Sequence, residues 1–103
     1  MKKIHSINDF ESLLQSEDRF FFLKHSLTCP ISGKAFDEYS SFINSSTENG
    51  YYLAVQDSRE LSGYIAEKFA IRHESPQAFL FIDGKPSWND SHFKITEKAL
   101  KAL

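Results

Sequence analysis

A cysteine and a serine three residues apart are the side chains of this chain best suited to chemistry. Cys29 is the only cysteine among 103 residues, and it lies in the stretch Leu27–Ser32, which reads LTCPIS. Pro30 fits the first position of a helix, where no backbone N–H is needed, so Cys29 is predicted to be the N-cap. Its sulfur would then face the free amides of Ile31 and Ser32 and the positive end of the helix dipole. Both favour a thiolate over a thiol, and the pattern therefore predicts a nucleophilic cysteine.

An ordinary core cysteine is the alternative interpretation of Cys29, because free cysteines are among the most buried residue types. Core cysteines belong inside helices and strands, whereas Cys29 stands between a predicted strand and a predicted helix. Loops at the carboxyl ends of parallel strands are also where α/β sheets commonly bind ligands. The position of Cys29 therefore favours the reactive interpretation.

Ser32 occupies the position at which a dithiol protein would carry its resolving cysteine. Serine cannot form a disulfide, so a redox site here would be monothiol and would need a second thiol from another molecule. Two other interpretations of Ser32 stay open: a plain residue of the first helical turn, or a hydrogen-bond partner of the sulfur. A single cysteine also excludes an internal disulfide framework, a CxxC pair and a cysteine-built zinc site.

The composition narrows the class of protein. Twelve Lys and Arg against fourteen Asp and Glu give a net charge of -2, so the basic surface that nucleic acid requires is absent. The longest apolar runs are far shorter than the roughly 20 residues of a membrane span, and no signal-peptide core is present. We expect a single domain over residues 1–103 in the cytoplasm, where a free thiol stays reduced.

Three stretches in the first half of the chain follow helix or strand periods. Asn8 is predicted to cap a first helix over residues 9–16, with a glutamate three residues on as its capping-box partner. The apolar run Phe20–Lys24 is typical of a strand buried on both faces. From Pro30 apolar residues recur at the helical period, and Tyr51–Val55 is predicted to be a second strand. This order predicts a parallel, right-handed βαβ unit.

The second half of the chain predicts a ββα unit, joined to the first half by a helix. We expect Asp57 to cap that helix and Ala78–Ile82 to form a third strand. Asp83-Gly84 is a two-residue hairpin signal that leads to a short fourth strand, and Pro86 indicates that this strand lies at an edge. Thr96 is expected to cap a last helix. The sum is an α/β fold of the thioredoxin-like arrangement, with a central four-stranded mixed sheet flanked by helices.

Four further residues are candidates for the site. In the thioredoxin-like arrangement the proline before the third strand, here Pro76, is cis and lies beside the catalytic loop, so Ser75 is expected to contact an extended peptide or thiol ligand. His25 ends the first strand and could stabilise a thiolate, or it could pack in the loop. Lys24 could add positive potential. The four histidines have no metal-ligand spacing, so no metal site is expected.

The chain resembles the monothiol bacilliredoxins, small proteins of the bacillithiol system with a Thr-Cys-Pro-Ile-Ser motif. The similarity runs over nearly the whole chain in order and spacing. Phe93 stands where the family usually has Trp, which we interpret as a packing variation. The segments that carry the resemblance are Phe22–Ser32, Ser75-Pro76-Gln77, Asp83-Gly84-Lys85-Pro86, Ser91-His92 and Ile95-Thr96.

The resemblance implies a thioredoxin-like fold and the removal of bacillithiol from proteins that carry it as a mixed disulfide. Cys29 would be the nucleophile and Pro76 the cis-proline. Lys24, His25 and the free helix amides would be candidate contacts for the sugar and carboxylates of bacillithiol. Bacillithiol would be a co-substrate, with no tightly bound cofactor, and bacillithiolated client proteins would be the partners. The residues that would shape the active loop are Thr28, Pro30, Ile31 and Ser32.

Two alternatives to this oxidoreductase activity remain open on the sequence. An iron–sulfur carrier like some monothiol glutaredoxins would need a dimer and external thiols, because each chain supplies one cysteine. A non-catalytic thioredoxin-like binding or adaptor domain would not need the thiol of Cys29 at all.

Overall fold

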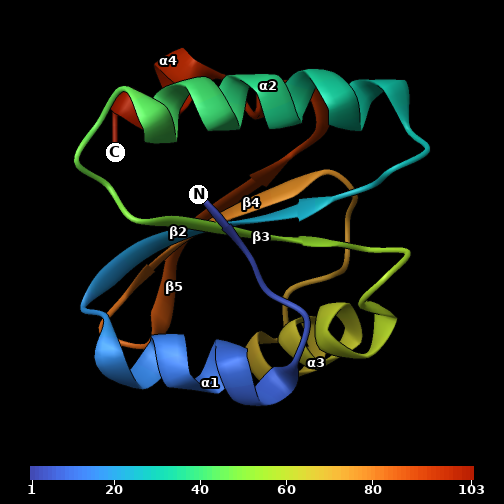
Figure 1. Cartoon of the computed structure of the whole chain (residues 1–103), viewed down its shortest axis with the longest axis vertical. Coiled ribbons are helices and arrows are strands. Elements are labelled where there is room, and N and C mark those ends of the chain that lie inside the picture. Colours follow the sequence, from blue (N-terminus) through green and yellow to red (C-terminus); the bar gives the residue numbers. More distant parts are fainter.

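A mixed sheet lies between two layers of helices in the computed structural model, which describes residues 1–103 (Figure 1). The helices α2 and α4 cover one face of the sheet, and α1 and α3 cover the other. The elements in chain order are β1 (Lys2–Lys3), α1 (Ile7–Ser16), β2 (Arg19–His25), α2 (Pro30–Asn44), β3 (Gly50–Ala54), α3 (Arg59–Phe69), β4 (Gln77–Ile82), β5 (Lys85–Ser91), the 3-10 turn η1 (His92–Lys94) and α4 (Glu97–Lys101).

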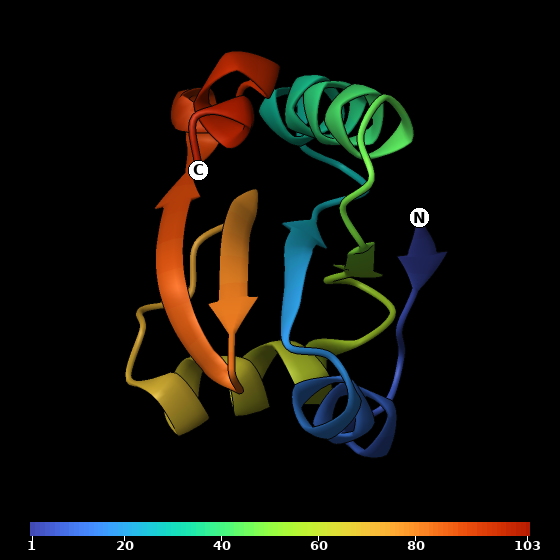
Figure 2. The same ribbon diagram turned by 90° about the vertical axis from the view of Figure 1, so that its left-hand side faces the viewer.

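The strands lie side by side in the order β1-β3-β2-β4-β5, and Figure 2 shows the sheet from one edge to the other. The strand β3 is parallel to β1 and β2, whereas β4 is antiparallel to both of its neighbours. The predicted βαβ unit and the following ββα unit are therefore confirmed. Because β2 and β3 are parallel, the loops that follow them emerge at the same edge of the sheet.

The sheet has five strands, so the prediction of four was wrong. The additional strand β1 pairs Lys2 with Tyr51 and Lys3 with Tyr52, and the Ile4 amide continues the ladder by donating to the Tyr52 carbonyl at 2.8 Å. The two residues of β1 are both lysines. They carry no apolar alternation, so the hydrophobic period cannot reveal the strand.

Two of the predicted helix caps are also wrong by one or two residues. The helix α1 begins at Ile7, and its N-cap is Ser6, whose hydroxyl accepts from the Asp9 amide at 3.1 Å. The helix α3 has Ser58 as its N-cap without a side-chain bond. Asp57, the predicted cap, instead pairs with the Lys3 ammonium at 2.9 Å. Long-range pairing has displaced a local signal here.

The C-terminal unit follows its predicted signals more closely. The turn residues Asp83 and Gly84 have φ values of 52° and 78°, as a tight hairpin of the primed type requires. The strand β5 that follows is an edge strand containing Pro86, as predicted, but its seven residues make it longer than the short strand expected. Thr96 caps α4 by accepting from the Ala99 amide at 3.1 Å.

Alternating residues of β2 fill two separate cores. Phe20 and Phe22 belong to the core under α1 and α3, and Phe21 and Leu23 belong to the core under α2 and α4. Each of these four side chains is fully buried. The strand thus anchors both helical layers and holds its carboxyl end, where the chain leaves for Cys29, in a fixed place. No helix of the structure is both long enough and apolar enough to cross a membrane.

The second parallel strand approaches α2 closely at Gly50. A Cβ atom at this position would lie 2.6 Å from both Cγ1 and Cδ1 of Ile43, which is far inside van der Waals contact. A glycine is therefore required for β3 to pass beneath the last turn of α2. This contact packs the C-terminal end of α2 against the sheet, and Cys29 caps the N-terminal end of the same helix.

Candidate active site

Cys29 is the N-cap of α2 and Pro30 is the first residue of the helix, as predicted. The Cys29 carbonyl accepts from the amides of Ser32 at 3.0 Å and Gly33 at 3.2 Å, which closes the first turn. The side chain of Cys29 makes no capping hydrogen bond, so the expected contact between the sulfur and the helix amides is not formed. The thiol is partly exposed and unpaired, which leaves it free to meet a partner.

Ser32 is fully buried, and its hydroxyl joins the start of α2 to the end of β2. The Ser26 amide donates to Ser32 Oγ at 2.7 Å, and Oγ lies 3.0 Å from Nδ1 of His25. Because the amide fills an acceptor site of the hydroxyl, the hydroxyl proton is available for the imidazole nitrogen. Ser32 therefore has a structural role, because its hydroxyl ties together the two ends of the four residues between β2 and α2, the Cys29 loop.

His25 takes part in this arrangement as a neutral imidazole. Burial lowers its pKa below the usual range, which keeps the ring uncharged at neutral pH. The ring also packs at a centroid distance of 4.5 Å from Phe36, on the second turn of α2. Of the two interpretations of His25, the contacts support the packing role, because its ring packs on Phe36 and its polar partner is Ser32.

Gln56 fastens the Cys29 loop from the other side, and the sequence did not indicate it. Its Oε1 accepts from the Leu27 amide at 3.0 Å, while its Nε2 donates to Ser26 Oγ at 3.0 Å and to Thr28 Oγ1 at 3.4 Å. Gln56 follows β3, and Leu27 and Thr28 follow β2. The only available signal was its place after a parallel strand, at the edge where such sheets gather their functional loops.

The second candidate segment leads into β4. The peptide bond between Ser75 and Pro76 is cis, as predicted. The Pro76 carbonyl accepts from the His92 amide at 3.1 Å, and the His92 ring lies 3.4 Å from the Glu74 carboxylate. The Ser75 hydroxyl is buried without a hydrogen-bond partner. The segment is therefore bound to η1 and has one polar atom left over for a ligand.

The side chain of Lys24 points to the opposite face of the sheet from the side chain of His25, which lies beside the start of α2. Successive side chains of a strand point to opposite faces, so Lys24 is directed towards α3 with Phe20 and Phe22, and His25 towards α2. The Lys24 ammonium donates to the Ser62 carbonyl at 2.9 Å and lies 3.2 Å from Nδ1 of His73. The Lys24 ammonium thus bonds to α3 and to the segment before β4, and not to Cys29.

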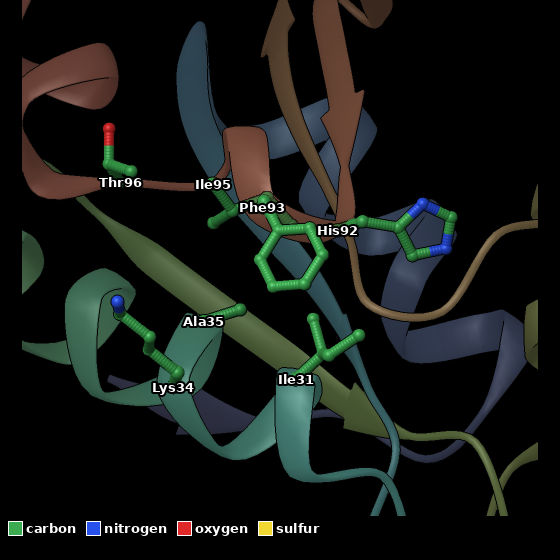
Figure 3. Close-up of a pocket in the computed structure, with 7 residues that line it drawn as sticks. All are labelled: Ile31, Lys34, Ala35, His92, Phe93, Ile95 and Thr96. Carbon is green, nitrogen blue, oxygen red and sulfur yellow. The ribbon is translucent and has the colours of Figure 1, made fainter.

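A small pocket of about 60 Å³ lies between the start of α2 and η1 (Figure 3). The side chain of Ile31 and the ring of Phe93 face one another across it, while His92 points away. Phe93 is 75% exposed, and Leu27, two residues before Cys29, is 55% exposed. Of the predicted loop residues, Ile31 therefore contributes an apolar wall, and the position that departs from the family pattern, Phe93, forms the opposite wall.

The chemistry available at this edge of the sheet is that of one accessible thiol. Cys29 has no second sulfur within the chain with which to form a disulfide. No group of three or more His, Cys, Asp or Glu side chains is gathered where it could hold a metal ion. A thiol at a helix N-terminus, on a loop fastened from both sides, is suited to exchange with a disulfide brought by another molecule.

Comparison with solved structures defines the class of protein. A protein with a thioredoxin fold, provisionally assigned as an oxidoreductase, is 45% identical, with 97% of this chain and 89% of that chain covered and a TM-score of 0.93. The thioredoxins of Plasmodium falciparum and Fasciola hepatica both have TM-scores of 0.80. The first is 16% identical over 100% of this chain and 95% of its own, and the second 15% identical over 99% and 94%. The chain thus has the thioredoxin fold.

The family follows from the sequence comparison. Residues 2–100 match the model of the family described as monothiol bacilliredoxin BrxC, so the chain belongs to the monothiol bacilliredoxins. The predicted family and fold are confirmed. Family, fold and the accessible thiol together give this chain a role in thiol redox chemistry.

Proposed function

We propose that this chain is a monothiol thiol–disulfide oxidoreductase that removes bacillithiol from client proteins, acting as one domain in the cytoplasm. The observation that carries the proposal is the pairing of a partly exposed Cys29 at the N-cap of α2 with a serine three residues on. The site has one sulfur to give, so the second sulfur of each exchange must come from solution. Membership of the monothiol bacilliredoxin family favours bacillithiol as that external thiol.

The first step is attack of the Cys29 thiolate on the bacillithiol sulfur of the client's mixed disulfide. The bond between bacillithiol and the client breaks, a bond between bacillithiol and Cys29 forms, and the client leaves as a thiolate that takes up a proton. No net oxidation occurs in this step. The cis peptide before Pro76 and the unpartnered hydroxyl of Ser75 are our candidates for holding the incoming disulfide, with Ile31 and Thr28 shaping the loop.

The second step is attack by a free bacillithiol thiolate on the bacillithiol sulfur that Cys29 holds. Bacillithiol disulfide forms and Cys29 leaves as a thiolate, ready for another client. Over the two steps the client sulfur is reduced and the thiol of the one free bacillithiol is oxidised, which balances the exchange. Ser32 supports this route because its oxygen cannot displace bacillithiol from Cys29, and its hydroxyl is engaged with Ser26 and His25.

The direct test is to incubate the protein with a client that carries bacillithiol and to follow both masses. We expect the client to lose bacillithiol while Cys29 gains it, and we expect free bacillithiol to remove it again. Cys29→Ser should abolish the transfer, whereas Ser32→Ala, which keeps the thiol, should still accept the adduct. Transfer that persists in Cys29→Ser, or an adduct that never appears on the wild-type chain, would refute the proposal.

A further inference from the structure

A second hollow lies at the same edge of the sheet as Cys29, on the side of α3. It has a volume of about 180 Å³ and is lined by Val55, Arg59, Ser62, Gly63 and His73. The Val55 amide donates to the His25 carbonyl at 2.8 Å, and the next residue along the chain is the glutamine that holds the Cys29 loop. His73 precedes the cis peptide by two residues. The hollow therefore adjoins both segments of the candidate active site.

A buried ammonium group stands behind this hollow. Lys24 is fully buried, and both partners of its Nζ atom, Ser62 and His73, are lining residues of the hollow. No carboxylate lies within 4.0 Å of this ammonium, and burial lowers the pKa of Lys24 to about 8. At pH 7 the group is still mostly protonated. A buried charge with no counter-charge is costly, and an anion in the hollow would reduce that cost.

His73 presents a hydrogen-bond donor to its surroundings. An ammonium group only donates, so Nδ1 of His73 accepts from Lys24 at 3.2 Å and the ring carries its proton on Nε2. Ser62 Oγ also lies 3.2 Å from Nδ1, which fixes the ring from a second direction. Since Nδ1 is turned toward Lys24, the N–H group on Nε2 of this exposed residue is available to a ligand.

Arg59 completes the set of positive groups around the hollow. It lies on the first turn of α3, is exposed, and pairs with no carboxylate within 4.0 Å. Glu74 is the acidic residue closest to His73 in sequence, and its carboxylate is 3.4 Å from the His92 ring. A Cβ atom placed on Gly63 would meet nothing within 4 Å, so this side of the hollow is open. A planar carboxylate fits the fork of a guanidinium group that has no partner.

We propose that this lysine-backed hollow, formed by Arg59, Ser62, Gly63 and His73 in front of Lys24, binds a carboxylate of bacillithiol while the thiol exchanges at Cys29. The inference rests on the proposed function and adds to it the part of the molecule that recognises the small thiol. Sulfur chemistry would then belong to the loop that follows β2, and carboxylate recognition to the first turns of α3 and the segment before β4. An acidic side chain of the client is the competing occupant, which the experiment separates.

The test compares bacillithiol disulfide with the same disulfide whose carboxylates are esterified. Cys29 attacks either compound in the same way, forming a mixed disulfide and releasing one thiol. We expect the wild-type chain to react with the free acid about fivefold faster than with the ester, the effect of one exposed ion pair. The net charge of -2 would by itself favour the ester, which lacks the negative charges of the acid, so a preference for the acid requires a local positive site.

Arg59→Gln should lower the ratio of the two rates at least about twofold, and Gly63→Val should do the same by filling the hollow without changing charge. Taking the ratio within one variant cancels any general change in thiol reactivity. Lys34→Gln removes a cation from the pocket beside Ile31 and is the matched control, since it should leave the ratio unchanged. If Lys34→Gln lowers the ratio and Arg59→Gln does not, the carboxylate binds in the pocket beside Ile31 and the inference is wrong.

The outcomes also separate this inference from the proposed function. If neither disulfide reacts with Cys29, the proposed function fails. If both react at equal rates in the wild-type chain, the exchange stands and the hollow is not a carboxylate site. If Arg59→Gln slows only the reaction with a bacillithiolated client and leaves the ratio for the small disulfides intact, the hollow serves the client and the inference is wrong.

Discussion

The hydroxyl of Ser32 and the Nδ1 atom of His25 lie 3.0 Å apart, so the residue three places after the cysteine is hydrogen-bonded to the last residue of β2. The amide of Ser26 reaches the same oxygen at 2.7 Å. A dithiol protein would need this position for its second sulfur. Here the position holds the loop together, and the monothiol character of the site is coupled to its local stability.

Removing the Ser32 hydroxyl should therefore destabilise the fold. In Ser32→Ala the buried Ser26 amide loses its acceptor, and we expect the free energy of unfolding to fall by about 1–3 kcal/mol. Ser16→Ala is the matched control, because its hydroxyl bonds an exposed carbonyl of its own helix, and it should change stability by less than about 0.5 kcal/mol. Urea unfolding of both variants checks this. Equal losses of stability in the two variants would mean that the hydrogen bonds of Ser32 do not stabilise the fold.

Ser32→Cys should convert the site from monothiol to dithiol chemistry. A thiol at this position stands one helical turn from Cys29, so it can displace bacillithiol from Cys29 and leave an internal disulfide. We expect mass spectrometry to find the adduct on the wild-type chain and free bacillithiol with an oxidised chain for the variant, in the absence of added thiol. A variant that retains the adduct as long as the wild-type chain would show that the buried position is out of reach.

Loss of the Gln56 side chain should loosen the Cys29 loop. In Gln56→Ala the Leu27 amide has no acceptor, so its hydrogen exchange should accelerate about fivefold or more, the equivalent of roughly 1 kcal/mol. Gln56→Glu keeps the acceptor for Leu27 and loses only the donor to Ser26 and Thr28. The Leu27 amide should therefore stay protected in the glutamate variant. Exchange measured by NMR at this amide distinguishes the two contacts.

The buried Lys24 should make stability depend on alkaline pH. Its folded pKa of about 8 is below its unfolded value, so the unfolded chain binds more protons between these values and stability rises with pH. From pH 7 to 9.5 we expect the wild-type chain to gain about 2 kcal/mol relative to Lys24→Met, which has no such group. Denaturant titrations of both proteins at the two pH values measure the difference. A constant difference would mean that the ammonium is as well solvated in the folded chain as outside it.

A methyl group at Gly50 should disturb the seat of α2. The added Cβ would lie 2.6 Å from two carbons of Ile43, so we expect Gly50→Ala to lower the free energy of unfolding by about 1–3 kcal/mol. Gly33→Ala is the control, because nothing lies within 4 Å of its added carbon. It should stabilise α2 by about 0.5–1 kcal/mol. Thermal unfolding of both variants should therefore shift in opposite directions.

The features that the sequence predicted well are those set by local chemistry. Pro30 marks the first turn of α2 and thereby identifies Cys29 as its cap, whatever lies elsewhere in the chain. Asp83-Gly84 likewise defines its turn through two positive φ values. The apolar run Phe20–Leu23 within β2 follows from helices on both faces of the sheet. These local signals predict the fold, whereas the family was indicated by the resemblance of the Cys29 motif and the later segments.

The features that were missed depend on contacts between distant residues. Ser6 and Asn8 are both good N-cap residues with an acidic residue three positions later. Ser6 is the cap in the structure, where Ile7 begins the helix and packs against the core. Lys24 meets Ser62 and His73, which are 38 and 49 residues away, so its direction could not be read from its neighbours. Gln56 likewise accepts from the Leu27 amide, which is 29 residues away in the sequence, so its contact with the Cys29 loop could not be predicted from local signals.

The two margins of the sheet bear on how this chain behaves among other proteins. On one side β1 offers only two residues for pairing, and on the other β5 contains Pro86 and is out of register with β4 between Leu80 and Phe81. Short or interrupted margins resist the addition of a foreign strand, which is the usual first step of aggregation. The proposed exchange needs only a brief encounter with each client, and sheet margins that resist pairing would let the chain leave once bacillithiol has been transferred.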